Sequence, residues 1–172
     1  MALCSLDKNI TRASNCQYVL NEISEIYLTD FANASGVTAS NPSGSCSGGT
    51  EATIDSGITW YKIEVAKGSA SFTDELVVED YGKYRTHTLT FNTVGSFNAC
   101  MNKALNDLSL GKYIAIVKTA SGNILLGRTL GLEATTATLA GGNDQNGMQI
   151  VLAGNATEEA LPVPGTFKVA AD

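Results

Sequence analysis

The sequence is short of charge and of long apolar runs, and each shortage excludes a class of protein. Only 16% of its 172 residues are charged, whereas 44% are hydrophobic; soluble domains usually carry about 25% charged residues. Small uncharged residues must therefore cover much of the surface, which favours a protein that packs against copies of itself. No apolar run approaches the roughly 18 residues of a membrane helix, and the N-terminal residues lack a basic and then apolar leader. We expect a soluble protein made in the cytoplasm, without membrane contact.

Histidine and cysteine are also too few, or too scattered, for common catalytic and metal sites. His87 is the only histidine, and no two of the four cysteines form a C-x-x-C pair, so the spacing offers no zinc half-site. A Ser-His-Asp triad would have to use His87, which lies in a strand-like stretch, and we expect this histidine on the strand surface. The cysteines are expected to be free thiols, and a Cys4 to Cys16 bridge remains the alternative.

Basic residues are scarce as well. The net charge is −6 and the 11 lysines and arginines are spread along the chain, which excludes a nucleic-acid scaffold. The segment GSCSGGT lacks the G-K-[ST] ending of a phosphate loop. The acidic pairs, such as Glu158 with Glu159, are expected to be solvated rather than catalytic. We therefore predict no enzymatic activity and no catalytic, cofactor or metal site.

The N-terminal third alternates between strand-like and loop-like composition. Residues 1–21 predict an extended arm, and ISEIYLTDF (23–31) a strand. Residues 32–57 are rich in turn-forming residues and predict a long loop or a loosely held hairpin that contacts a partner. ITWYKIEVA (58–66) predicts a strand that is partly covered on both faces.

Residues 69–92 predict a projecting hairpin with its turn near residues 80–83, where Gly82 suits a tight turn. Its outer half is too polar to lie on a core. We therefore expect the hairpin to be an arm that contacts another subunit through Glu75, Glu79, Tyr81, Lys83 and Arg85.

A helix is predicted at about 96–109, with Ser96 as N-cap and Gly111 after its end. Apolar residues recur there at helical spacing: Phe97, Cys100, Met101, Ala104, Leu105 and Leu108. One such helix would cover one face of a sheet.

The stretch GKYIAIVKTASGNILLGRTLGLEA (111–134) predicts two apolar strands joined at residues 121–123, the second running from Ile124 to Leu132. Both faces of the first strand are apolar. We expect Tyr113, Ala115 and Val117 to face an opposite sheet and Ile114 and Ile116 to meet the helix. Arg128 is the remaining oligomer-contact candidate: it pairs with a carboxylate of a neighbouring strand or subunit, or lies on the rim.

A last strand is predicted around residues 148–153, and the proline-containing tail 157–172 is expected to lie over the surface. About eight strands and one helix predict a mainly β (α+β) single domain, 1–172. Its architecture would be a β-sandwich or half-open barrel with one flanking helix.

Several stretches together resemble small virion structural proteins of phages that infect Bacteroidetes, which are similar in layout to phage tail-tube subunits. The resemblance rests on LCSLDKNI, ISEIYLTDF, TWYKIEVAKGSASFTDEL, NACMNKALNDL and KYIAIVKTASGNILLGRTLGLEAT, and covers roughly residues 3–153. It implies a tail-tube-like sandwich with a long hairpin and a long loop, assembled in hexameric rings whose inner strands form a continuous barrel.

The leading hypothesis is thus a non-enzymatic phage virion protein, a tail-tube or tail-ring subunit that forms a homo-oligomeric ring conducting DNA. Its partners would be itself, in a hexameric or other ring, and adjoining virion proteins, with DNA as non-specific cargo of the lumen. It would be located in the virion after assembly in the host cytoplasm. The alternatives are a head-tail adaptor, a capsid decoration protein, or a carbohydrate- or receptor-binding module that uses Trp60, Tyr61 and Tyr81.

Overall fold

A computed structural model describes residues 22–23, 25–41, 49–66, 68–93, 99–141 and 147–171 of the chain. These residues are mainly β-strand with one α-helix, which confirms the expected fold class. The predicted arm 1–21, the predicted N-cap Ser96 and three cysteines, Cys4, Cys16 and Cys46, lie outside the described residues.

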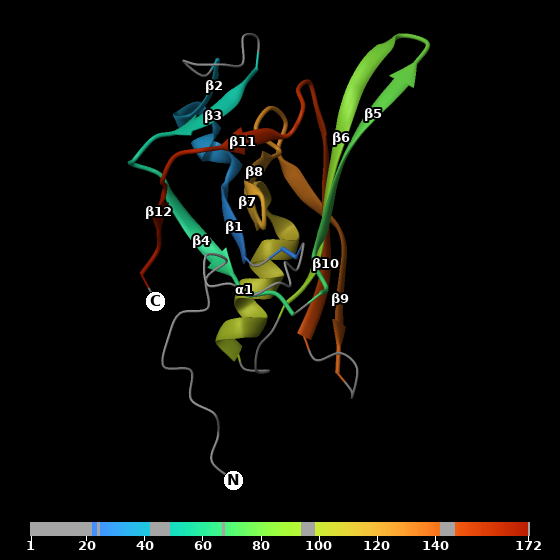
Figure 1. The fold of residues 1–172 in the computed structure, drawn as a ribbon. Helices are drawn as coiled ribbons and strands as arrows, with labels where there is room; N and C mark the ends of the chain where they lie inside the picture. The colour runs from blue at the N-terminus through green and yellow to red at the C-terminus, as the bar shows by residue number, and fades with distance from the viewer. Residues whose placement is uncertain are drawn as a thin grey trace, which may run out of the picture.

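The elements follow one another along the chain in a strand-rich order, and Figure 1 shows their arrangement. The strands are β1 (Glu25–Asp30), β2 (Val37–Ser40), β3 (Glu51–Ile54), β4 (Thr59–Ile63), β5 (Ser71–Glu79), β6 (Gly82–Asn92), β7 (Lys112–Thr119), β8 (Gly122–Leu126), β9 (Leu132–Ala140), β10 (Gly147–Ala156), β11 (Leu161–Val163) and β12 (Lys168–Val169). A 3-10 helix, η1, spans Phe31–Gly36, and the α-helix, α1, spans Ala99–Leu110.

Ten of the described strands form one sheet that branches at β7. Its main path runs β12-β4-β1-β7-β9-β10-β6-β5. One edge of β7 pairs with β1, whereas the other pairs with β8 along residues 115–119 and with β9 at residues 112–113. In turn, β8 pairs with β11. The strands β4, β1, β7 and β8 therefore lie in one layer, and β9, β10, β6 and β5 continue into a second layer that packs against it.

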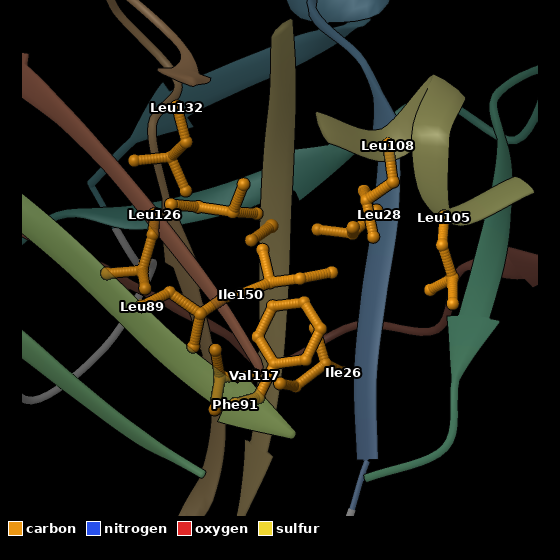
Figure 2. Packing of buried hydrophobic residues seen from close by; sticks show 12 residues of the cluster. Ile26, Leu28, Leu89, Phe91, Leu105, Leu108, Val117, Leu126, Leu132 and Ile150 are labelled. Carbon is orange, nitrogen blue, oxygen red and sulfur yellow. The ribbon is translucent and has the colours of Figure 1, made fainter. Parts of the chain in front are cut away.

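The main hydrophobic core lies between these two layers. Its buried side chains come from both layers and from the helix: Ile26, Leu28, Leu89, Phe91, Leu105, Leu108, Ala115, Val117, Leu126, Leu132, Ile150 and Leu152. Figure 2 shows Phe91 and Ile150 close to Ile26 and Val117, so that β6 and β10 face β1 and β7. Each valine, leucine, isoleucine and phenylalanine side chain among them contributes about 1.5–3 kcal/mol by leaving water, so this cluster accounts for much of the stability.

A second core covers the opposite face of β1, β7 and β8. It is centred on Trp60, which is fully buried, and contains Tyr27, Val37, Ala52, Ile58, Ile114, Ile116, Leu125, Leu161 and Val163. Both faces of β7 are therefore buried, as its unbroken apolar sequence indicates. As predicted, Tyr113, Ala115 and Val117 face the other layer, but the helix lies on their side of β7 and not on the side of Ile114 and Ile116. Val117 shares the core of the helix residue Leu108, whereas Ile114 and Ile116 lie in the Trp60 core.

The C-terminal segment builds the second core rather than lying over the surface. Leu161 and Val163 are buried on β11, with Pro162 exposed between them. The ring of Phe167 lies edge-on to Trp60 and Tyr27, with ring centroids 5.9 and 5.0 Å apart. Finally, β12 pairs in parallel with β4. The predicted surface tail is thus wrong for Leu161, Val163 and Phe167, whose side chains pack in the second core, whereas residues 164–166 and 168–169 are exposed.

The segment 32–57 contains more structure than a loop. After η1, β2 and β3 pair as an antiparallel hairpin in register from Val37 with Ile54 to Ser40 with Glu51. Val37 and Ala52 face the Trp60 core. Of the two predicted alternatives, the hairpin describes these strands.

The predicted hairpin 69–92 is formed by β5 and β6, which pair from Ser71 with Thr90 to Glu79 with Gly82. The turn is made by residues 80–81. Phe72 and Leu89 at its foot pack in the main core, whereas its tip projects beyond the rest of the molecule at the upper right of Figure 1.

Candidate functional site

The outer face of the β9-β10-β6-β5 layer is uncharged at its centre. Alternation places Leu89, Phe91, Ile150 and Leu152 in the core, so their neighbours along each strand point outward. At the centre of this outer face the registers pair Ser71 with Thr90, Thr73 with Thr88, Val151 with Thr90 and Thr136, and Ala153 with Thr88, and Thr138 follows two residues after Thr136 on β9, opposite Gln149. Charged side chains, such as Glu75 and Glu133, stand only at its margins. We call this central set of residues the threonine-rich face.

Both edges of the layer lack a strand partner within the described part of the chain. On one side β5 pairs only with β6. On the other side β9 pairs with β7 at residues 132 and 133 alone, which leaves its remaining edge unpaired. Neither strand contains proline or lysine, residues with which monomeric β-proteins block such edges, although β9 has a register shift opposite Val151 and Leu152.

The tip of the hairpin exposes large apolar side chains. Leu76 and Val78 are 52% and 62% exposed, and Tyr81 at the turn is fully exposed. Leu76 and Val78 lie on the same face of β5 as Phe72 of the core, four and six pairs further out. The hairpin is therefore longer than the core that supports it, and its apolar face continues into solvent.

The residues predicted as oligomer contacts divide into two groups. Glu75, Glu79, Tyr81 and Lys83 are exposed on the hairpin. Glu79 accepts a hydrogen bond from the Tyr84 hydroxyl at 3.0 Å, and this hydrogen bond lies at the exposed surface.

The other two predicted contacts, Arg85 and Arg128, pair within the chain. Arg85 Nη1 donates to Asp74 Oδ1 at 3.0 Å. Arg128 Nε donates to Glu158 Oε1 at 2.6 Å, Nη2 donates to Oε2, and Nη1 lies 3.4 Å from the Val37 carbonyl oxygen. The hydrogen bonds to Glu158 raise the pKa of Arg128. The carboxylate predicted for Arg128 thus lies in its own C-terminal segment.

His87 is buried, which corrects its predicted place on the strand surface. Its side chain is 2% exposed, and its Nδ1 accepts a hydrogen bond from the Gly127 N–H at 3.1 Å. The sequence held a signal for this position, since His87 alternates in phase with the core residues Leu89 and Phe91. No local sequence pattern singles out Asp74, whose Oδ1 lies 3.5 Å from His87 Nε2.

The aromatic residues of the alternative carbohydrate-binding hypothesis do not form one surface. Trp60 is fully buried in the second core, so it presents no ring to a ligand. Tyr61 is 59% exposed on β4, whereas Tyr81 stands at the tip of the hairpin. Figure 1 places β4 and this tip on opposite sides of the molecule.

A groove of about 710 Å³ lies between α1 and the strands β1 and β4. Leu28, Ile63, Leu105 and Leu108 form its apolar part, and Asp107 is among the polar residues at its walls. The described residues contain no group of three or more His, Cys, Asp or Glu side chains that could hold a metal ion. Nor does the described part include a helix long and apolar enough to cross a membrane.

Comparison of the chain with protein-family models, with curated proteins and with solved structures gives no match.

Proposed function

We propose that the protein is a non-enzymatic phage virion subunit of the tail-tube or tail-ring type, and that copies of it assemble into a ring around a conduit for DNA. The observation that carries this proposal is the β9-β10-β6-β5 layer: within the described residues β5 and most of β9 have no strand partner on their outer edges, and the outer face is uncharged at its centre. The resemblance to phage virion proteins points in the same direction.

The two edges suit a ring because they are different surfaces. An unpaired edge presents free backbone N–H and C=O groups, which bind another strand by continuing the sheet. If β5 of one copy pairs with β9 of the next, the contact is head-to-tail, and such contacts close into rings when the rotation between copies permits. The layers of successive copies then join into one continuous sheet.

The threonine-rich face suits a lumen that lets DNA pass. Lysine and arginine would bind phosphates and release counterions, whereas this face offers DNA no cation at its centre. The glutamates at its margins and the net charge of −6 repel the DNA backbone. DNA is thus a cargo of the lumen without sequence-specific contacts.

The hairpin supplies a further contact. The apolar surface of its exposed Leu76, Val78 and Tyr81 is removed from water only if another molecule covers it. A neighbouring copy in the ring, or an adjoining virion protein, provides that cover.

The test is the oligomeric state of the purified full chain, measured by mass photometry and negative-stain electron microscopy. We expect rings of uniform size whose population rises with protein concentration. A chain that stays monomeric at every concentration, with no rings in the images, would contradict the proposal.

Two matched lysine substitutions locate the contact. Val78→Lys places a charge on the hairpin, and we expect it to reduce ring formation at least tenfold while the circular dichroism spectrum is unchanged. Leu110→Lys changes another exposed apolar residue, at the end of α1, and should leave assembly intact. Equal effects of the two substitutions would assign the assembly to general surface hydrophobicity instead of the hairpin.

A further inference from the structure

A buried polar cluster joins three separate segments at the foot of the β5-β6 hairpin. His87 on β6 accepts the Gly127 N–H through Nδ1, and Gly127 begins the turn between β8 and β9. Asp74 on β5 accepts the Ala160 N–H through Oδ2 at 2.9 Å, and Ala160 immediately precedes β11. The cluster therefore connects the hairpin both to the 127–131 turn and to the C-terminal segment.

The hydrogen bond from Gly127 fixes the protonation of His87. Nδ1 can accept an N–H only if it carries no proton itself, so the single ring proton of the neutral side chain lies on Nε2. That nitrogen is buried and makes no hydrogen bond to the described residues, although Asp74 Oδ1 lies 3.5 Å away. The protein thus holds a neutral imidazole in one tautomer.

Three charged groups on different elements act on His87: Asp74 on β5, Arg85 on β6 and Glu158 in the C-terminal segment. In the turn, the charge of Arg128 is paired with Glu158. Burial is the largest influence and lowers the pKa of His87; Asp74 and Glu158 raise it, and Arg85 lowers it. The net direction is downward, so the folded protein favours the neutral form more than the unfolded chain does.

We propose that His87 is an acid-sensitive latch that holds the foot of the hairpin to the 127–131 turn. When Nδ1 gains a proton, it points an N–H at the Gly127 N–H, and two donors then face each other without an acceptor. The turn must separate from β6 for either group to reach water. This proposal goes beyond the proposed function and does not depend on ring formation.

The expected size of the effect follows from proton linkage. One proton is taken up on opening, so the equilibrium constant for opening rises up to tenfold for each pH unit below the ordinary histidine pKa of 6.5. The rise ends where the closed form itself becomes protonated. The equilibrium constants for opening at sites far from the cluster should not depend on pH in this way.

The test is amide hydrogen exchange of the full chain, followed by NMR from about pH 7.5 to about pH 5 and corrected for the intrinsic pH dependence of exchange. We expect the protection factor of the Gly127 amide to fall up to tenfold per pH unit in the lower half of this range. The amide of Ile116, in the centre of β7, serves as the internal reference and should change much less.

His87→Asn is the matched control because its side-chain oxygen can accept the Gly127 N–H but does not titrate. In this variant the protection of Gly127 should be independent of pH, with Asp74 and Glu158 still present. A constant Gly127 protection in the wild-type chain, or the same pH dependence in His87→Asn, would overturn the proposal.

Should His87→Asn fail to fold, the ring nitrogens of His87 in the wild-type chain provide the second measurement. Their ¹⁵N shifts report the protonation of Nδ1 directly. We expect Nδ1 protonation and loss of Gly127 protection at the same pH. A fall in protection while Nδ1 stays unprotonated would reject the latch.

Discussion

Gly131 and Gly154 pass so close to one another that a Cβ atom on Gly154 would lie within 3.0 Å of the Gly131 carbonyl oxygen. Gly131 has a φ of 78°, a conformation that side-chain-bearing residues rarely adopt. The pair lies where the chain leaves the 127–131 turn to enter β9 and runs alongside β10.

Gly154→Ala should therefore destabilise the protein by about 1–3 kcal/mol, because backbone atoms must shift to admit the methyl group. The free energy of urea-induced unfolding measures this change. Gly165→Ala is the control, since a Cβ there meets nothing within 4 Å. Equal stabilities of the two variants would show that the close approach is absent in solution.

Phe167→Ala should release the C-terminal segment from the second core. The lost contacts of Phe167 with Trp60 and Tyr27 are expected to cost about 2–4 kcal/mol, somewhat below a fully buried phenylalanine because the ring is partly exposed. Hydrogen exchange of β11 and β12 should accelerate more than that of β6. The neighbouring substitution Lys168→Ala, at an exposed position, should change neither the stability nor the hydrogen exchange of β11 and β12.

We expect the protein to lose stability at low pH because of Glu25. A hydrogen bond from Tyr27 and the nearby Lys118 and Lys62, at 3.0 and 3.3 Å, lower the pKa of Glu25 from 4.5 to about 2, against the opposing effect of burial. Because the folded pKa lies below the unfolded one, the stabilisation is complete above pH 4.5 and is lost as the pH falls from 4.5 towards 2. We expect a loss of roughly 1–2 kcal/mol, as partial exposure screens the carboxylate.

Tyr27→Phe tests the cause of that shift. The variant removes the hydroxyl donor and keeps the lysines, so NMR titration of the Glu25 carboxyl group should give a pKa closer to 4.5 than in the wild-type chain. An unchanged Glu25 pKa would mean that the lysines alone produce the shift.

The ion pair of Arg128 and Glu158 should couple the 127–131 turn to the C-terminal segment. A double-mutant cycle with Arg128→Gln and Glu158→Gln should give a coupling energy of about 1–2 kcal/mol, since two parallel hydrogen bonds join partly buried charges. Lys103 and Asp107, an exposed pair on α1, should give about 0.3–0.5 kcal/mol in the same measurement. Similar values for both cycles would contradict the structural role of Arg128.

The sequence was sufficient to predict elements whose residues alternate strongly or recur at helical spacing. The two strands of the β5-β6 hairpin, β7 and α1 all show such patterns. Alternation separates the two faces of a strand but does not say which element covers each face, which is why the helix was predicted on the side of Ile116 and lies on the side of Val117. Which element covers each face of β7 depends in part on the path of the chain after β10.

The predictions that failed concern residues with weak local patterns. LEATTATLA of β9 is exposed on both faces along residues 135–139, so no period marks it as a strand. In LPVPGTFKV the apolar residues are separated by proline and glycine, and their burial depends on Trp60, a hundred residues earlier. The partner of Arg128 and the burial of His87 likewise depend on long-range contacts.

The two hydrophobic cores are separated by a single layer of β-sheet. On β7 the Val117 side chain belongs to one core and Ile116, its immediate neighbour, to the other. Neither core can lose its packing without exposing the back of the strand that supports the other. Heating should therefore melt both together, and a calorimetric scan of the folded chain should show one cooperative transition instead of two.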